Sequence, residues 1–264
     1  MWIAAFLVLA APTLAFLWEK WTRNIWYNGH GLLMPVILAF VGADALRRRG
    51  VTREEPSAWG FAFLVPALAL LAIDSAIHTE LLSAFALLVA LPGFSLLLLG
   101  PQRTRALAFP FAVSFLSLPI PAAFLERLHL VLRHLTASGT DWVLQALGFS
   151  VFVDGTVMHL PGGTLLVAEE CSGFSALYAA VTIALVLAYM TRSPRRRVVI
   201  LLAAFPLALL CNVMRIVALA IMAEWYGYDL LDTPLHVMSG YVSFVLTLAI
   251  LFLFAERRPR RARA

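Results

Sequence analysis

The chain has 264 residues, of which 62% are hydrophobic, and its mean hydropathy is +0.88. A soluble domain of this length cannot bury so much apolar material, whereas apolar runs of about 20 residues are typical of membrane-spanning helices. The net charge of +5 comes from basic residues clustered between the apolar runs, which argues against nucleic-acid binding. We therefore predict an all-α, polytopic membrane protein with one membrane-embedded domain over residues 1–264, surrounded by membrane lipids.

Eight apolar stretches predict eight transmembrane helices. They cover residues 2–17, 32–45, 59–77, 81–99, 106–120, 173–190, 198–223 and 236–254. With the N-terminus inside the cell, 15 of the 20 lysines and arginines fall in inner segments, four fall in outer segments, and Arg215 falls inside a span. Because basic residues are enriched on the cytoplasmic side, we expect both termini to be cytoplasmic, including the basic tail 256–264.

The longest outer loop covers residues 121–170 and begins with a helical pattern. In residues 124–136, charged side chains recur against leucines at helical spacing. This pattern predicts an amphipathic helix lying in the membrane interface or, equally, a short helix packed across the bundle. A second short helix is expected after Gly139.

The rest of that loop predicts a small β-structure. Turn signals at 154–155 (Asp-Gly) and 161–163 (Pro-Gly-Gly) separate three β-prone segments. These segments are 150–153, 156–160 and 164–168. We predict an outer hairpin or meander that leads directly to Cys171, and we expect it to cover a bound substrate together with residues 124–136.

Cys171 lies on the outer side, at the start of the sixth predicted span. A helix N-terminus or a nearby cation lowers the pKa of a thiol and favours the nucleophilic thiolate. Ser172 and Gly173 suit a tight helix entry, and Gly173 has no side chain to obstruct a substrate. Glu169 and Glu170 could accept hydrogen bonds, orient a partner or cap the helix. The alternative is a small buried cysteine without a chemical role.

Arg215 lies within an apolar run, nine residues before Glu224. At a rise of 1.5 Å per residue it is about 13 Å below the outer helix end. An arginine at that depth costs several kcal/mol unless it faces a cavity or a partner. Asn212 lies on nearly the same helix face, which favours a polar cavity, whereas snorkelling to the outer surface is the alternative.

His236 begins the eighth predicted span, again on the outer side, and histidine can act as base and acid near neutral pH. On its own it would more often be an interfacial hydrogen-bonding residue. The predicted topology places Cys171, Arg215 and His236 in the outer leaflet region. A nucleophile, a base and a fixed cation are the groups needed for acyl transfer through a thioester.

Other chemistry has weaker support in the sequence. Six histidines fall on the outer side, but none forms a metal-binding motif, so we predict no metal and no cofactor. Cys211 is interpreted as a packing residue. Two cysteines are too few for a disulfide framework, and we expect both to be free thiols.

Three motifs of this chain resemble the exosortase/archaeosortase family. They are Cys-Ser-Gly at 171–173 after an acidic pair, Asn-x-x-Arg-Ile at 212–216, and the later His236. Tyr-Asn-Gly-His-Gly at 27–31 is similar to the family's Tyr-Ser-His-Gly segment, with Asn-Gly in place of Ser. Leu-Pro-Ile-Pro at 118–121 is similar to its Pro-x-Pro segment. The resemblance runs from about residue 21 to residue 240 and adds Tyr27 and His30 as supporting residues.

The resemblance implies a cysteine protease or transpeptidase of the bacterial cytoplasmic (inner) membrane, active at the outer, periplasmic face. Its substrates would be exported proteins with a C-terminal sorting signal: a short motif such as Pro-Glu-Pro, a transmembrane helix and a basic tail. Cys171 would attack the peptide bond, assisted by Arg215 and His236. Water, an amine, a polysaccharide or a lipid-linked molecule would accept the chain.

Two other functions remain open at the level of sequence. An arginine that faces a cavity also suits an anion or sugar path, so the chain could be a non-enzymatic scaffold or transporter in exopolysaccharide export. An acyltransferase that uses Cys171 as the acyl carrier would share the nucleophile.

Overall fold

The computed structural model describes residues 6, 8–23, 29–32, 34–49 and 55–256. Contacts within the chain divide it into two compact units, 1–120 and 121–264, and each is described by itself. The single membrane-embedded domain stays a prediction.

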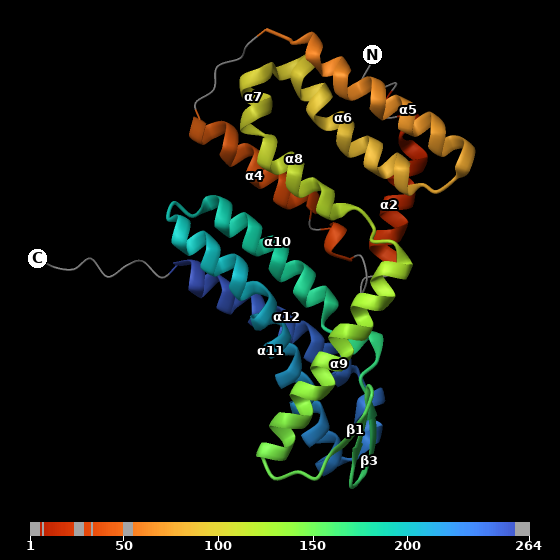
Figure 1. The fold of residues 1–264 in the computed structure, drawn as a ribbon, viewed down its shortest axis with the longest axis vertical. Helices are drawn as coiled ribbons and strands as arrows, with labels where there is room; N and C mark the ends of the chain where they lie inside the picture. The colour runs from red at the N-terminus through yellow and green to blue at the C-terminus, as the bar shows by residue number, and fades with distance from the viewer. Residues whose placement is uncertain (1–5, 7, 24–28, 33, 50–54, 257–264) are drawn as a thin grey trace, which may run out of the picture. The chain divides into compact units, whose positions relative to one another are not determined.

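The first unit is helical in its described residues. Its elements are α2 (Ala11–Arg23), η1 (Gly29–Leu32), α4 (Met34–Arg49), η2 (Ala58–Gly60), α5 (Phe61–Ile77), α6 (Leu81–Leu99), α7 (Pro101–Ala106), α8 (Ala108–Ser114) and η3 (Phe115–Ser117). Helices α5 and α6 lie side by side (Figure 1). They approach closely because Gly60 faces Gly93: a Cβ on Gly60 would lie 2.6 Å from the Gly93 carbonyl oxygen.

The second unit combines helices with a small sheet. Its elements are α9 (Ala122–Ala146), β1 (Phe152–Asp154), β2 (Val157–Leu160), β3 (Gly163–Leu166), η4 (Glu169–Cys171), α10 (Phe174–Met190), α11 (Pro194–Tyr226), η5 (Tyr228–Asp232) and α12 (Pro234–Glu256). Helix α11 packs against α9, α10 and α12, so it forms the centre of the unit (Figure 1). The contact of α10 with α11 is built on small residues such as Ala180, Ala184 and Ala204, which are buried.

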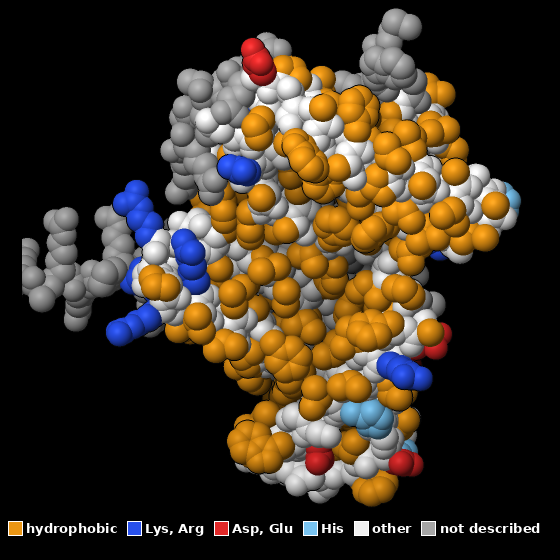
Figure 2. All heavy atoms as spheres, turned by 45° about the horizontal axis from the view of Figure 1, so that its top comes forward, with side chains coloured by type: hydrophobic (Ala, Val, Ile, Leu, Met, Phe, Trp, Pro, Cys, Tyr) orange, Lys and Arg blue, Asp and Glu red, His pale blue; other side chains and the backbone are white. Residues whose placement is uncertain are grey.

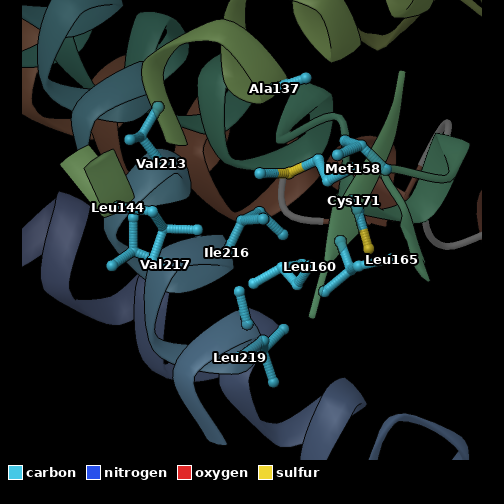
Figure 3. Packing of buried hydrophobic residues seen from close by; sticks show 12 residues of the cluster. Ala137, Leu144, Met158, Leu160, Leu165, Cys171, Val213, Ile216, Val217 and Leu219 are labelled. Carbon is cyan, nitrogen blue, oxygen red and sulfur yellow. The ribbon is translucent and has the colours of Figure 1, made fainter. Parts of the chain in front are cut away.

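The sheet confirms the predicted meander within two residues of each boundary. Its strand order is β1-β2-β3, and both pairs are antiparallel. Its inner face joins a cluster of buried apolar side chains that includes Met158, Leu160 and Leu165 with Val213 and Ile216 of α11 (Figure 3). The sheet is therefore fixed against the same helix that carries Arg215.

The prediction of eight spans is confirmed only in part. Four described helices are long and apolar enough to cross a membrane: Ala58–Ile77, Leu81–Leu99, Pro194–Tyr226 and Pro234–Ala255. Segments Ala108–Ser117 and Phe174–Met190 are apolar but shorter. The stretch 106–120 is shortened because Pro119 and Pro121 cannot continue a helix. The first predicted stretch, 2–17, lies partly outside the described residues.

Apolar side chains are not confined to the interior of the helical elements. Hydrophobic side chains cover much of the surface visible in Figure 2. On α12, for example, Val242 is 66% exposed and Val245 is 62% exposed. Such exposed apolar helix faces are expected for spans in contact with lipid.

The expectation of two helices around Gly139 is wrong, because α9 continues through it. A Cβ at Gly139 would lie 2.9 Å from Val213 Cγ2, so the glycine permits close packing on α11 instead of ending the helix. One face of α9, including Leu132 and Thr136, is buried. This buried face agrees with the second of the two predicted options, a helix packed against other helices. A position in the membrane interface stays a prediction.

Candidate active site

Cys171 ends η4, just before α10, and is 2% exposed. Gly173 adopts a left-handed conformation (φ 76°), which turns the chain sharply into α10. Cys171 Sγ lies 3.1 Å from Nε2 of His236, which is in the first turn of α12. Figure 3 shows the Cys171 side chain beside Leu165, which belongs to the same buried cluster. The sulfur is thus shielded and faces an imidazole.

Arg215 lies in the interior of the unit and is 8% exposed. Its Nε donates to Ser239 Oγ at 2.9 Å, and its terminal nitrogen donates to the His236 carbonyl at 3.2 Å. The guanidinium also lies close enough to the Cys171 side chain to interact with it electrostatically. Gly240 leaves room beside it, because a Cβ there would lie 3.5 Å from Arg215 Cζ. The side chain is therefore held by α12 and does not extend to the outer surface.

The structure brings Cys171, Arg215 and His236 together from three elements that are far apart in sequence. The distance from sulfur to imidazole suits proton transfer. A positive guanidinium next to the sulfur stabilises negative charge on it. This arrangement can support nucleophilic attack by sulfur and stabilisation of an oxyanion.

Asn212 fixes the backbone of the cysteine. Its Nδ2 donates to the Cys171 carbonyl at 2.8 Å and to Thr136 Oγ1 at 3.1 Å, and the side chain is 2% exposed. A Cβ at Gly173 would lie 2.7 Å from Asn212 Cγ. Gly173 is therefore required by its conformation and by the proximity of Asn212.

Helix α9 supplies two further contacts that the sequence analysis missed. His129 Nδ1 lies 2.8 Å from Ser172 Oγ, both side chains are buried, and the His129 ring packs on Phe174 at 4.9 Å. Arg133 donates to the Val167 carbonyl at 2.7 Å and to Thr156 Oγ1 at 2.9 Å. The segment that carries Cys171 is thus bound to α9 on both sides of the cysteine.

The C-terminal end of α11 holds the turn between β2 and β3. The Gly162 N–H donates to Glu224 Oε1 at 3.0 Å, and the Tyr228 hydroxyl donates to Glu224 Oε2 at 3.0 Å. Burial, followed by the hydrogen bond and charge of Glu224, raises the pKa of Tyr228 to about 12. Gly163 lies close to the Tyr228 ring, because a Cβ there would be 3.0 Å from a ring carbon.

The remaining predicted residues are less closely tied to this centre. Glu169 is half-buried in η4, and Ser172 faces His129. Tyr27 and the side chain of Glu170 lie outside the described residues. His30 lies in η1, in the first unit and not in the unit that holds Cys171.

Cys211, four residues before Arg215, is buried, as is Cys171, and neither forms a disulfide bond. Within the described residues, no three histidine, cysteine, aspartate or glutamate side chains group as metal ligands. A narrow gap adjoins the cysteine backbone and is lined mainly by apolar side chains, together with Ser172, Gly173 and Asn212; it leaves no room for a water-sized molecule.

The family model for transmembrane exosortases matches residues 18–253, nearly the whole chain. The chain belongs to the transmembrane exosortase family. It is therefore a multi-pass membrane protein, and the resemblance noted in the sequence is confirmed. Membership implies a role for this exosortase as a transpeptidase that processes sorting signals of substrate proteins. Among curated proteins and among solved structures, no match was found.

Proposed function

We propose that this exosortase is a cysteine protease or transpeptidase that cleaves C-terminal sorting signals through a thioester on Cys171. The observation that carries the proposal is the 3.1 Å approach of Cys171 Sγ to His236 Nε2, with Arg215 interacting with the same sulfur. These groups come from three elements, and each is held by contacts within one compact unit.

The reaction has two steps. His236 Nε2 accepts the thiol proton, and Cys171 Sγ attacks the carbonyl carbon of the substrate. Arg215 stabilises the oxyanion, and His236 gives the proton to the leaving amine, so that the C–N bond breaks and a thioester remains. Water or an acceptor amine then attacks the thioester, His236 removes a proton from it, and the Cys171 thiolate leaves and is reprotonated.

The length of α11 matches the proposed substrate. Arg197 and Arg215 are 18 residues apart in this continuous helix, or about 27 Å, which is close to the thickness of the hydrocarbon core. A substrate span with its basic tail at the depth of Arg195–Arg197 therefore presents its upstream peptide at the depth of Cys171. This supports an active site at the outer face of the bacterial cytoplasmic membrane, with both termini inside.

The test compares Cys171→Ala with Cys211→Ala in cells that co-express a tagged substrate with a sorting signal. We expect Cys171→Ala to abolish cleavage and Cys211→Ala to retain it, because both are buried cysteines outside any disulfide but only Cys171 faces His236. His236→Ala and Arg215→Ala should each lose most activity. Full processing by Cys171→Ala would refute the proposal.

The acceptor is identified by mass spectrometry of the released chain. A free carboxyl terminus identifies water, and added mass identifies an amine, a lipid-linked molecule or a polysaccharide. A trapped adduct on Cys171 that contains a lipid acyl group instead of peptide would favour the acyltransferase alternative. A cysteine-free variant that still supports polysaccharide export would favour a scaffold or transporter.

A further inference from the structure

Strand β3 is an edge strand that leads directly to the nucleophile. It pairs with β2 on one side only, and four residues separate its end at Leu166 from Cys171. Figure 1 shows β3 at the border of the sheet. An unpaired strand edge is a template for an additional extended chain.

The alternation of backbone bonds identifies the groups on the open edge. The Val167 N–H donates to the Thr156 carbonyl at 2.9 Å, on the side of β2. Because bonded and non-bonded pairs alternate in an antiparallel ladder, Leu165 and Gly163 also face β2, whereas Thr164 and Leu166 face outward. The Leu166 carbonyl accepts a bond from the Ala168 N–H. For the Thr164 N–H and C=O and the Leu166 N–H, the described part of the chain provides no partner.

We propose that the substrate segment upstream of the scissile bond pairs in parallel with this edge of β3. The pairing rests on the proposed function, since it concerns the peptide that Cys171 cleaves. One substrate residue, opposite Leu165, donates its N–H to the Thr164 carbonyl and accepts a bond from the Leu166 N–H. In a parallel pair, one residue bonds to the C=O and the N–H of the two residues that flank its partner, here Thr164 and Leu166. An antiparallel strand would instead use the N–H and the C=O of Thr164 alone.

The parallel direction follows from where β3 begins and ends along α11. The turn before β3 is hydrogen-bonded to Glu224. The chain after β3 continues to Cys171, which lies beside Arg215. Those two residues of α11 are about 13 Å apart along the helix, so β3 runs from the outer end towards the membrane. A substrate anchored by a C-terminal span also runs from outside towards the membrane.

The distance to the sulfur sets the register. From Leu165 to Ala168 the chain covers at most about 10 Å, because it turns at Val167, and η4 adds at most about 6 Å. An extended substrate covers this distance in about five residues. The paired residue therefore lies at most about five residues upstream of the scissile bond. Hydrogen bonds to the main chain do not depend on the identity of the side chain. The proposed pairing therefore accepts substrates that differ in sequence at the paired residue.

The test uses synthetic sorting-signal peptides that are N-methylated at one residue at a time. Their Kd is measured by fluorescence anisotropy on full-length Cys171→Ala exosortase in nanodiscs. N-methylation removes one N–H without changing the enzyme. We expect one position, within about five residues of the scissile bond, to weaken binding about three- to tenfold, as expected for one lost peptide hydrogen bond. A scan with no sensitive position, or with one only downstream of the scissile bond, overturns the proposal.

Two proline variants separate the parallel from the antiparallel register. Leu166→Pro removes the N–H that the parallel register uses, so it should raise Kd, whereas Leu166→Ala keeps that N–H and should bind normally. Thr164→Pro removes an N–H that only the antiparallel register uses, so its Kd should not change. The reverse result overturns the parallel pairing.

Cleavage by the unsubstituted protein is measured separately. A flat N-methyl scan with Cys171-dependent cleavage refutes the pairing alone, whereas cleavage that survives Cys171→Ala refutes the proposed function alone.

Discussion

Replacing Asn212 with alanine removes the hydrogen bond that holds the Cys171 carbonyl in place and a second one to Thr136 of α9. Asn212 Nδ2 lies 2.8 Å from that carbonyl and 3.1 Å from Thr136 Oγ1, and the side chain is 2% exposed. Each buried acceptor that loses its donor costs about 1–3 kcal/mol. For the two acceptors together, we expect the free energy of unfolding to fall by about 2–6 kcal/mol. If about 1.4–2.8 kcal/mol of this loss appears in the transition state, kcat falls about 10- to 100-fold.

The assay measures initial cleavage rates and urea unfolding of the purified full-length protein. Cys211→Ala is the matched control, because Cys211 is the neighbour of Asn212 on α11 and is also buried. Thr136→Val removes only the second acceptor and should have a smaller effect on kcat. If Asn212→Ala keeps the kcat of Cys211→Ala while both unfold at similar urea concentrations, Asn212 does not position the nucleophile.

Three further predictions follow from contacts at the site. Gly173→Ala should lower kcat at least a hundredfold and lower the Tm, because a Cβ there is strained at φ 76° and lies 2.7 Å from Asn212 Cγ; normal cleavage would contradict the required conformation. Arg215→Lys should lower kcat at least about tenfold, since an ammonium cannot reproduce the planar fork that reaches Ser239 and the His236 carbonyl; unchanged kcat would show that charge alone suffices. The raised pKa of Tyr228 means that its stabilising contribution is complete below about pH 10 and is lost as the pH rises towards 12. The tyrosinate absorbance of the protein minus that of Tyr228→Phe should therefore titrate near pH 12, and a difference centred at pH 10 would exclude the buried, bonded hydroxyl.

The elements that sequence patterns identified best are those with local causes. Strands β2 and β3 were predicted because Pro-Gly-Gly at 161–163 marks a turn between two β-prone segments. Gly139 was interpreted as a helix boundary, but its role depends on Val213, a residue 74 positions later. A glycine that breaks a helix and one that permits helix packing look the same in a single sequence.

The predicted site residues differ in how strongly the sequence marks them. Arg215 is conspicuous because a charge within an apolar run is costly unless it has partners. His236 and Cys171 became candidates through topology and through the family resemblance. Their approach within 3.1 Å depends on the packing of α10, α11 and α12, which no local pattern encodes.

His129 was missed because residues 124–136 were interpreted only as an amphipathic helix, and the polar side chains were not examined for partners near Cys171. In fact His129, Arg133 and Thr136 follow one another at i, i+4 and i+7, which places them on one face of α9. That face binds the cysteine segment at Ser172, at Val167 and, through Asn212, at the Cys171 carbonyl. Three polar residues at helical spacing beside a predicted active site were the available signal.

The same contacts indicate how a peptide reaches a sulfur that is 2% exposed. The backbone around Cys171 is bonded to α9 and α11 on both sides, so η4 cannot move away without breaking several buried hydrogen bonds at once. Leu165, by contrast, lies beside Cys171 in the same buried apolar cluster (Figure 3) and belongs to the edge strand β3. A peptide paired along the open edge of β3 would therefore be bound next to the residue that lies beside the nucleophile.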